Sequence, residues 1–350
     1  MTTTPQTVLL TGATGTVGAS VLAELLNNST YNVITVLRSC ARSEAFLRAK
    51  YASHVSSGRL SFLEIPDMAV AGSFDKAASR ADYIIHVATP LAFDPAQMMD
   101  HMVKPSWDMV QNVLSAADRS SSSRVKRVVV TGSMVSACRV DKLFSGGTMS
   151  SDTWNDITLE EAGQSPSTAY QFSKVHAERG AWEFMRAKPR KFDLIFLLAP
   201  SVTGKALQEG FKPSKSKLGG QAGMYSELFD VEKPGFLYPY FMDVEDVAKV
   251  HVKALSPDVP GNERYVFHHT RELMSSNNAA RMIREDFPQL RDRVVKPDEA
   301  AGGAGIHPTL IKSDASKAEK VFGSQWKSAR QSIRETVEDI ITLEDREVPP

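Results

Sequence analysis

The chain has 350 residues, of which 42% are hydrophobic and 23% are charged, a composition typical of a water-soluble globular protein. Its 41 basic and 41 acidic residues cancel, so there is no charge excess of the kind that attracts nucleic acid or an anionic membrane, and neither partner is expected. Two cysteines, Cys40 and Cys138, argue against a disulfide framework or a zinc site, and we expect no metal. Without a signal peptide or a long apolar segment, the sequence predicts a cytoplasmic protein.

Residues 7–18 predict a binding site for a dinucleotide. Residues 8–10 have the apolar run of a short buried strand, and residues 19–26 have the periodicity of an amphipathic helix. The glycines between them let the backbone approach a pyrophosphate, and the free N–H groups of a helix start hold its charge. The ending of a P-loop, Gly-Lys-Ser/Thr, is absent. The cofactor contacts predicted here are Thr11, Gly12, Thr14, Gly15, Thr16, Val17 and Gly18.

The predicted strand over 31–37 is followed directly by Arg38, with Arg42 one helical turn later. In a dinucleotide fold this position faces the adenosine ribose. A carboxylate there would accept hydrogen bonds from the 2′-OH of NAD, whereas arginines hold the 2′-phosphate of NADP. Arg38 and Arg42 therefore predict NADPH/NADP as the cofactor.

Further strands are predicted over 60–65, 81–88 and 125–131, with a long helix over 95–120 and another over 167–188. This alternation predicts the α/β class and a Rossmann-type doubly wound parallel sheet. Ligands bind beyond the carboxyl ends of such strands. The predicted cofactor site therefore also takes in Asp67, Met68, Ala88, Thr89, Pro90 and Thr131.

Tyr170 and Lys174 lie one turn apart on the helix predicted over 167–188, so they share a face. A positive charge beside a phenol lowers the pKa of the phenol and makes it a general acid usable near neutral pH. Ser133 follows the strand over 125–131 and is placed by topology to give the same carbonyl oxygen a second hydrogen bond. Together these residues predict proton transfer to a carbonyl.

With these motifs the chain resembles the extended short-chain dehydrogenase/reductases, in the branch of dihydroflavonol reductase, cinnamoyl-CoA reductase and the fungal ketoreductases, which include methylglyoxal reductase and aldehyde reductase II. The resemblance covers about 7–341. It depends on the stretches 86–90, 154–155, 170–174, 181–184, 243–248 and 262–265. Glu245 departs from the pattern of the branch, which has an arginine there.

The resemblance implies a catalytic triad of Ser133, Tyr170 and Lys174. Tyr170 would protonate the carbonyl oxygen as hydride arrives from the nicotinamide, Lys174 would also bind the nicotinamide ribose, and Ser133 would polarise the carbonyl. Asn112 is implied as a support for a proton-relay water. Because the chain has Thr-Gly-Ser-Met where the family often has Thr-Ser-Ser-Ala, Ser136 stays an alternative to Ser133.

We expect a dinucleotide domain over 1–203, to which 241–255 returns, a mostly helical C-terminal substrate lobe over 204–240 and 256–343, and a tail over 344–350. Glycines predict an irregular chain over 204–239, and helices are predicted over 276–287, 315–322 and 333–343.

By resemblance, Pro200 and Val202 lie beside the nicotinamide, and the lobe covers the substrate. The predicted substrate contacts are Leu91, Phe93, Met134, Val135, Tyr170, Met224 and Tyr225, with further apolar walls from Phe211, Phe236, Tyr238 and Tyr240. Such a pocket favours a hydrophobic ketone or aldehyde.

The sequence thus predicts an NADPH-dependent carbonyl reductase, a monomer or homodimer, that reduces a small-molecule ketone or aldehyde, with a place in secondary-metabolite biosynthesis as one role. The alternatives are an NADP-dependent epimerase or dehydratase, a double-bond reductase, or a catalytically silent NADP-binding regulator. Arg38 argues against sugar-nucleotide epimerases, which favour an acidic residue there. Tyr170 and Lys174 argue against the regulator, because such proteins usually lose one of the two.

Overall fold

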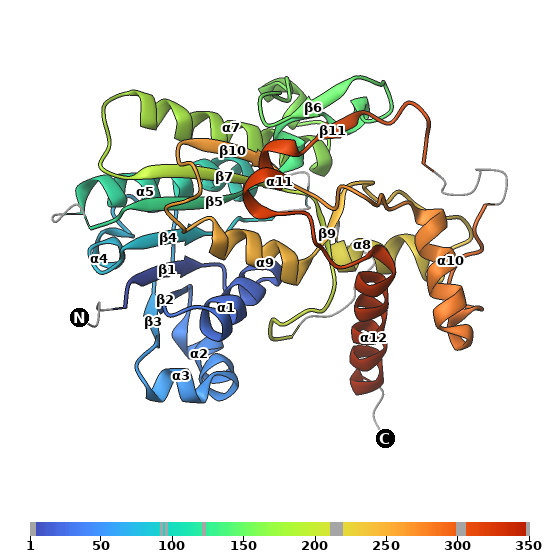
Figure 1. Cartoon of the computed structure of the whole chain (residues 1–350), viewed down its shortest axis with the longest axis horizontal. Helices are drawn as coiled ribbons and strands as arrows, with labels where there is room; N and C mark the ends of the chain where they lie inside the picture. Colours follow the sequence, from blue (N-terminus) through green and yellow to red (C-terminus); the bar gives the residue numbers. More distant parts are fainter. Residues whose placement is uncertain are drawn as a thin grey trace.

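The computed structural model describes residues 5–91, 94, 97–120, 124–210, 220–298 and 306–347. Seven parallel strands form its central sheet in the order β10-β7-β5-β4-β1-β2-β3 (Figure 1). The strand order reverses between β1 and β4, which confirms the predicted doubly wound fold. The strands are β1 (Thr7–Thr11), β2 (Asn32–Leu37), β3 (Leu60–Glu64), β4 (Tyr83–His86), β5 (Arg127–Ser133), β7 (Asp193–Ala199) and β10 (Glu263–Val266).

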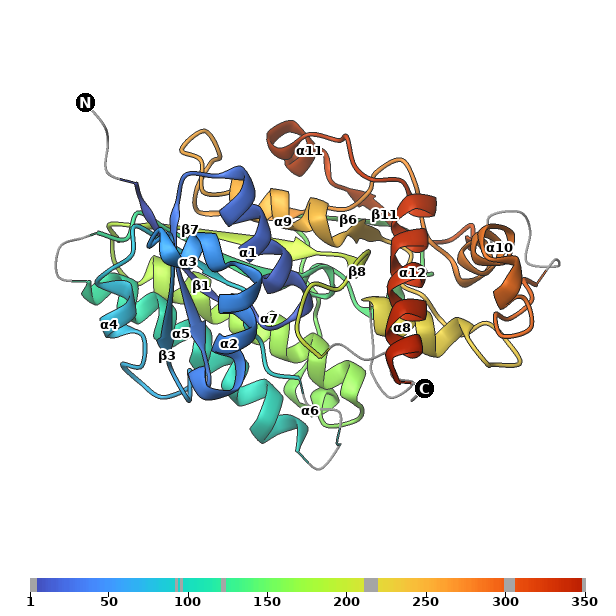
Figure 2. The same cartoon turned by 90° about the horizontal axis from the view of Figure 1, so that it is seen from below.

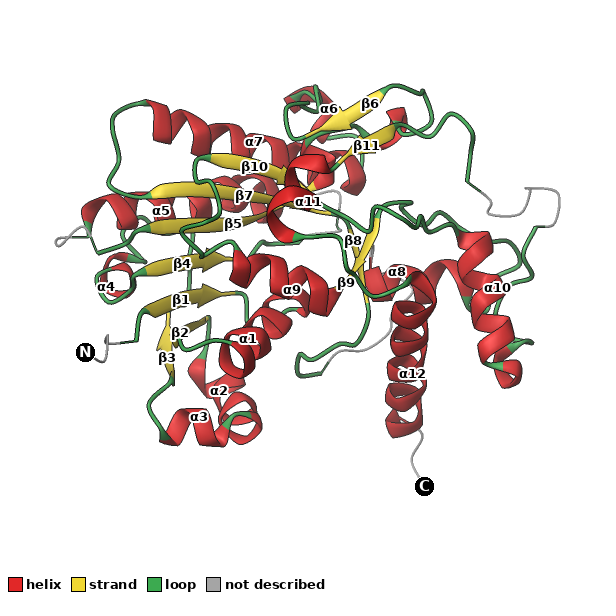
Figure 3. Ribbon diagram, viewed as in Figure 1, coloured by secondary structure: helices red, strands yellow, loops and turns green. Residues whose placement is uncertain are grey.

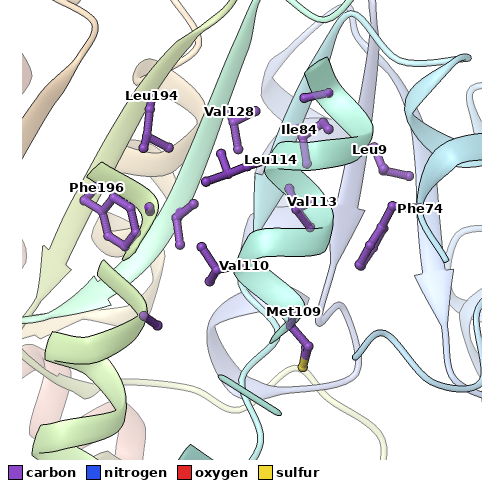
Figure 4. Close-up of a cluster of buried hydrophobic side chains, with 14 of the residues drawn as sticks. Leu9, Phe74, Ile84, Met109, Val110, Val113, Leu114, Val128, Leu194 and Phe196 are labelled. Atoms are coloured by element: carbon purple, nitrogen blue, oxygen red, sulfur yellow. The ribbon is translucent and has the colours of Figure 1, made fainter. Parts of the chain in front are cut away.

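Helices cover both faces of this sheet (Figure 3). On one face lie α4 (Asp75–Ala78), α5 (Lys104–Arg119) and α7 (Pro166–Arg186), and on the other α1 (Thr16–Asn28), α2 (Cys40–Lys50), α9 (Val244–Lys253) and α11 (Ser316–Phe322), with α3 (Ala52–Ser56) following α2. Side chains of the strands alternate between the two cores. Leu9 packs under α5, as Figure 4 shows, whereas Val8 and Leu10 pack under α1 and α9. This two-sided burial explains why the central strands are continuous apolar runs.

The helix predicted over 95–120 has two parts. A π-helical turn, η1 (Met99–Val103), leads directly into α5. Pro105, in the first turn of α5, has no N–H and interrupts the helical hydrogen bonding where the two parts meet.

A third hydrophobic core lies beyond the sheet, where α8 (Gly220–Leu228), α10 (Ser276–Asp286) and α12 (Ala329–Glu347) gather at one end of the molecule (Figure 2). Met224, Phe229, Ile283 and Val337 are fully buried in it. Two parallel strand pairs join the lobe to the sheet domain: β8 (Ser201–Thr203) with β9 (Phe241–Asp243), and β6 (Thr148–Ser150) with β11 (Lys312–Asp314). The short helices are α6 (Leu159–Ala162), η2 (Met134–Ser136), η3 (Val140–Lys142) and η4 (Pro288–Leu290).

The structure corrects three expectations about the C-terminal half. The segment over 204–239 is not irregular throughout, because it contains α8. The span 256–343 is not all lobe, because β10 pairs with β7 in the central sheet and α11 packs against β10. The expected tail begins inside α12, where the Glu344 carboxylate pairs with Arg293. None of the helices in the described ranges is long and apolar enough to span a membrane.

Candidate active site

The turn between β1 and α1 is shaped by glycines that no other residue could replace. Gly12 has a φ of +79°, and a Cβ there would lie 2.8 Å from the backbone nitrogen of Ala88. At Gly18 a Cβ would lie 2.0 Å from the carbonyl oxygen of Gly12. Thr14 and Gly15 are exposed at the start of α1. This cradle of close backbone and open N–H groups fits the pyrophosphate of a dinucleotide.

The side chain of Thr11 stabilises this turn through two hydrogen bonds. Its Oγ1 accepts a hydrogen bond from Ala88 N at 3.1 Å and bonds to His86 Nδ1 at 2.9 Å. The side chains of Thr11 and His86 are both buried. Burial and the charge of Lys174 lower the pKa of His86 to about 3, so the imidazole is neutral. The hydroxyl of Thr11 is bonded within the protein, and the predicted contact of Thr11 with the cofactor stays a prediction. The role of His86 was not predicted from the sequence.

Arg38 and Arg42 lie at the carboxyl end of β2 and in the first turn of α2, and both are exposed. Within the described part of the chain, neither guanidinium makes a hydrogen bond or an ion pair. Both are therefore available to a phosphate. The carboxylate of Glu64, at the end of β3, accepts a hydrogen bond from Cys40 N at 2.6 Å.

Asn112 holds the loop that follows β3. Its side-chain amide donates to the carbonyl oxygen of Met68 at 3.1 Å, and the Asp67 carboxylate in the same loop accepts from Ala69 N at 2.8 Å. Asn112 therefore positions the segment predicted to face the adenine. Its implied role beside a proton-relay water stays a prediction.

Ser133, Tyr170 and Lys174 come together where β5 ends against α7. A capping box at Ser165 fixes the start of α7. Lys174 Nζ lies over the Tyr170 ring, 5.7 Å from its centre, and the Ser133 hydroxyl interacts with the Tyr170 phenol and acts to lower its pKa. Ser133 Oγ also accepts from Val135 N at 3.4 Å. The structure therefore brings the three predicted catalytic side chains into one group.

The electrostatics of this group differ from the expectation. Burial raises the pKa of the Tyr170 phenol, and its hydrogen bond with Ser133 only partly offsets this rise. Burial also lowers the pKa of the Lys174 ammonium to about 8, against the smaller opposing effect of Glu178. The net lowering of the Tyr170 pKa predicted from the sequence is therefore not found. At neutral pH the phenol keeps its proton and Lys174 is mostly charged.

The alternative serine is less well placed. The Ser136 hydroxyl is fully buried and has no hydrogen-bond partner in the described ranges, whereas the Ser133 hydroxyl interacts with the Tyr170 phenol and acts to lower its pKa. The hydroxyl of Thr131, a predicted cofactor contact, bonds to His251 Nε2 at 2.8 Å, and His251 Nδ1 bonds to the carbonyl of Val247. This pair ties β5 to α9 and leaves His251 in the core.

The predicted substrate contacts divide into two groups. Met134 and Val135 follow Ser133 directly and are buried, and Leu91 is 54% exposed beyond β4, after Thr89 and Pro90. Met224 is 0% exposed and packs in the lobe core, and its predicted contact with the substrate stays a prediction. The Tyr225 hydroxyl is bonded to Glu344 of α12 at 3.0 Å. Phe93 and Phe211 lie outside the described residues.

The segment after β8 contributes contacts that the sequence did not predict. Pro200 directly follows β7, and Val202 lies half-buried in β8. Beyond them, Gln208 Nε2 donates to Thr16 Oγ1 at 2.9 Å, at the first residue of α1. Lys50 Nζ donates to the carbonyl of Leu207 at 2.7 Å. No local pattern marks these pairs, because more than 150 residues separate their members.

Comparisons with known proteins agree with this geometry. The model of the NAD dependent epimerase/dehydratase family matches residues 8–267. A putative NADPH-dependent methylglyoxal reductase of Candida albicans is 27% identical over 96% of this chain and 98% of its own length. A ketoreductase of Cercospora nicotianae is 28% identical over 97% of this chain and 96% of its own. The crystal structure of the yeast methylglyoxal/isovaleraldehyde reductase complexed with NADPH has a TM-score of 0.85 at 25% identity, covering 97% and 99% of the two chains.

Proposed function

Because this chain belongs to the NAD dependent epimerase/dehydratase family, we propose that it is an NADPH-dependent carbonyl reductase that acts on a hydrophobic ketone or aldehyde. The observation that carries the proposal is the grouping of Ser133, Tyr170 and Lys174 at the carboxyl edge of the sheet. The relatives named as NADPH-dependent reductases and a ketoreductase support it.

The cofactor site fits NADPH. The cradle formed by Gly12 and Gly18 would hold the pyrophosphate, and Arg38 with Arg42 would hold the 2′-phosphate. When bound, NADPH supplies the hydride that the reduction of a carbonyl requires. A cofactor on this cradle would extend along the carboxyl ends of the strands toward Tyr170.

The chain's own residues supply the proton. Tyr170 stays protonated at neutral pH because burial raises its pKa, so its hydroxyl donates to the carbonyl oxygen. The Ser133 hydroxyl gives that oxygen a second donor. When Tyr170 releases its proton, the ammonium of Lys174 above the ring stabilises the phenolate that forms.

The proposal is tested by the loss of NADPH absorbance with purified protein and a panel of carbonyl compounds, with NADH in parallel. The panel runs from small aldehydes through aryl ketones to 1,2-diketones and bulky natural-product ketones. We expect turnover with NADPH on at least one class. Tight NADPH binding without turnover on any carbonyl would instead favour the double-bond reductase or the silent regulator.

The substitution Arg38→Asp should reverse the charge offered to the 2′-phosphate. Loss of a charged hydrogen bond predicts an increase of about 10- to 100-fold in the Kd for NADPH. The Kd for NADH, which has no such phosphate, should change little. Fluorescence titration with both cofactors measures this. Equal weakening of the two would show that Arg38 does not contact the 2′-phosphate.

The rate of carbonyl reduction should fall as the pH rises through about 8, because Lys174 loses its charge there. Tyr170 does not produce this loss, since its pKa lies above the ordinary value of 10.0. A profile of kcat against pH measures the effect, and Lys174→Arg is the matched variant. That variant should be slower but free of the loss near pH 8, because a guanidinium stays charged. A loss that persists in Lys174→Arg would come from another group.

A further inference from the structure

Asn155 is a buried polar residue for which the proposed mechanism has no role. It lies in the segment between β6 and α6 and is 1% exposed. Every polar atom of its side-chain amide has a partner. Nδ2 donates to the carbonyl of Val135 at 2.8 Å and to Gln171 Oε1 at 3.2 Å, and Oδ1 accepts from Ile157 N at 2.8 Å. A buried amide whose hydrogen bonds are all made fixes the segments that it joins.

The bond to Val135 holds the short helix η2, which begins directly after Ser133. A second bond supports it, because the backbone N–H of Asn155 donates to the next carbonyl, that of Ser136, at 2.8 Å. The N–H of Val135 donates to Ser133 Oγ at 3.4 Å. Asn155 therefore fixes the orientation of the residue that bonds to the Ser133 hydroxyl.

The bond to Gln171 reaches α7 one residue after Tyr170. Gln171 is 4% exposed, and its Oε1 accepts from Val140 N at 3.0 Å as well as from Asn155. The amide of Asn155 thus joins the helix that carries Tyr170 to the turn that follows Ser133. Printed hydrogen bonds connect the two without passing through the bound substrate or cofactor.

The bond from Val135 also determines what the Ser133 hydroxyl can do. A serine hydroxyl has one hydrogen to donate and two lone pairs that accept. Since the Val135 N–H occupies a lone pair, the hydrogen of the hydroxyl is directed away from Val135. A substrate carbonyl oxygen needs that hydrogen as its second donor beside the Tyr170 hydroxyl.

We propose that Asn155 is a positioning residue, which acts through Val135 to hold the Ser133 hydroxyl where the carbonyl oxygen binds. The inference rests on the proposed reductase function and on the role that this function gives Ser133. A misplacement of about 1 Å in a reacting group can cost about 100-fold in rate. Asn155→Ala should therefore lower kcat by about 10- to 100-fold, while the Kd for NADPH changes little.

The test crosses Asn155→Ala with Ser133→Ala and measures kcat for the wild type, both single variants and the double variant. In Ser133→Ala the hydroxyl that Asn155 positions is already gone. Asn155→Ala should then lower kcat by about 2-fold or less, which is the margin within which independent effects add. A merely structural role would lower kcat by the same factor in both backgrounds. Equal losses in the two backgrounds, or no loss in either, would overturn the inference alone.

Gln171→Leu is a second variant that serves if Asn155→Ala does not fold. It is similar in size and removes the acceptor on α7 that Asn155 uses. Its loss of kcat should be smaller than that of Asn155→Ala and should also disappear in the Ser133→Ala background. A loss that is the same in both backgrounds would contradict the inference here as well.

The matched control is Asn278→Ala in the lobe. The Asn278 amide donates to the carbonyl of Leu273 at 3.0 Å and accepts from Ser275 N at 2.7 Å, so the variant also loses an asparagine bonded to the backbone. It should lower the melting temperature and leave kcat near that of the wild type. A loss of kcat as large as in Asn155→Ala would assign the effect to stability and overturn the inference. A wild type without turnover on any carbonyl, or Ser133→Ala with an unchanged kcat, would overturn the proposed mechanism and the inference with it.

Discussion

Replacing Tyr170 with phenylalanine is expected to lower kcat for carbonyl reduction by about 100-fold or more, which is the usual contribution of a positioned general acid. The substitution removes the hydroxyl that interacts with Ser133 and leaves the ring beneath Lys174 in place. Since the cradle at Gly12 and the arginine at 38 are untouched, the Kd for NADPH should change little. Steady-state kinetics on a substrate from the panel and fluorescence titration with NADPH measure the two quantities.

The matched control is Tyr265→Phe. Its hydroxyl donates to the carbonyl of Pro260 beside β10, at 2.9 Å. The variant therefore loses a tyrosine hydroxyl from the same sheet domain without touching the catalytic group, and its kcat should stay near that of the wild type. Turnover close to the wild type in Tyr170→Phe would assign the proton donor to another group. A large loss in Tyr265→Phe as well would show that the assay reports stability rather than proton transfer.

Much of the sheet domain could be predicted because its signals are local. Val8, Leu9 and Leu10 are each 0% exposed, so a short apolar run was sufficient to indicate a central strand. The glycines that follow are required by backbone contacts within the same turn. Tyr170 and Lys174 are on one helix, so their spacing alone placed them together.

The lobe was less predictable because its contacts join distant parts of the chain. The glycines around Met224 predicted an irregular chain and not a helix. In the structure Met224 is in α8, which packs against α10 and α12, so its side chain is in the lobe core. The hydrogen bonds of Gln208 with Thr16 and of Lys50 with Leu207 form only in the folded chain, because their members are far apart in the sequence. The span that includes β10 and α11 was assigned to the lobe because a single strand near the end of the chain does not reveal which sheet it joins.

The departure from the family pattern at Glu245 also has a tertiary explanation. The Glu245 carboxylate pairs with Lys327 Nζ at 3.0 Å, and the same ammonium pairs with Asp243 at 3.2 Å and Glu335 at 2.7 Å. Asp243 is 0% exposed and is held further by Ser332. Lys327 thus supplies positive charge beside the start of α9, where the branch has an arginine. Nothing near residue 245 in the sequence indicated this partner.

A second large effect is expected from Arg264→Met, which should lower the free energy of unfolding by about 3–5 kcal/mol. Arg264 Nε bonds to Glu178 Oε1 at 2.6 Å, and the Glu178 side chain is 0% exposed. The guanidinium also stacks on Trp154 and donates to the carbonyls of Ser151 and Thr153. Methionine keeps much of the volume but leaves the Glu178 carboxylate buried without its counter-charge. Urea denaturation measures the change.

The double variant Glu178→Leu/Arg264→Met separates two contributions to the loss of stability. One is the buried Glu178 carboxylate left without a counter-charge, and the other is the lost packing of Arg264. Replacing both members of a buried ion pair by apolar residues is often nearly neutral, so the double variant should recover most of the stability. If it stays as unstable as Arg264→Met, the cost comes from the loss of the stacking on Trp154 and of the two carbonyl contacts instead.

The catalytic group provides a second readout of the double variant. Glu178 raises the pKa of Lys174 one turn away, so without Glu178 the double variant should lose activity at a lower pH than the wild type.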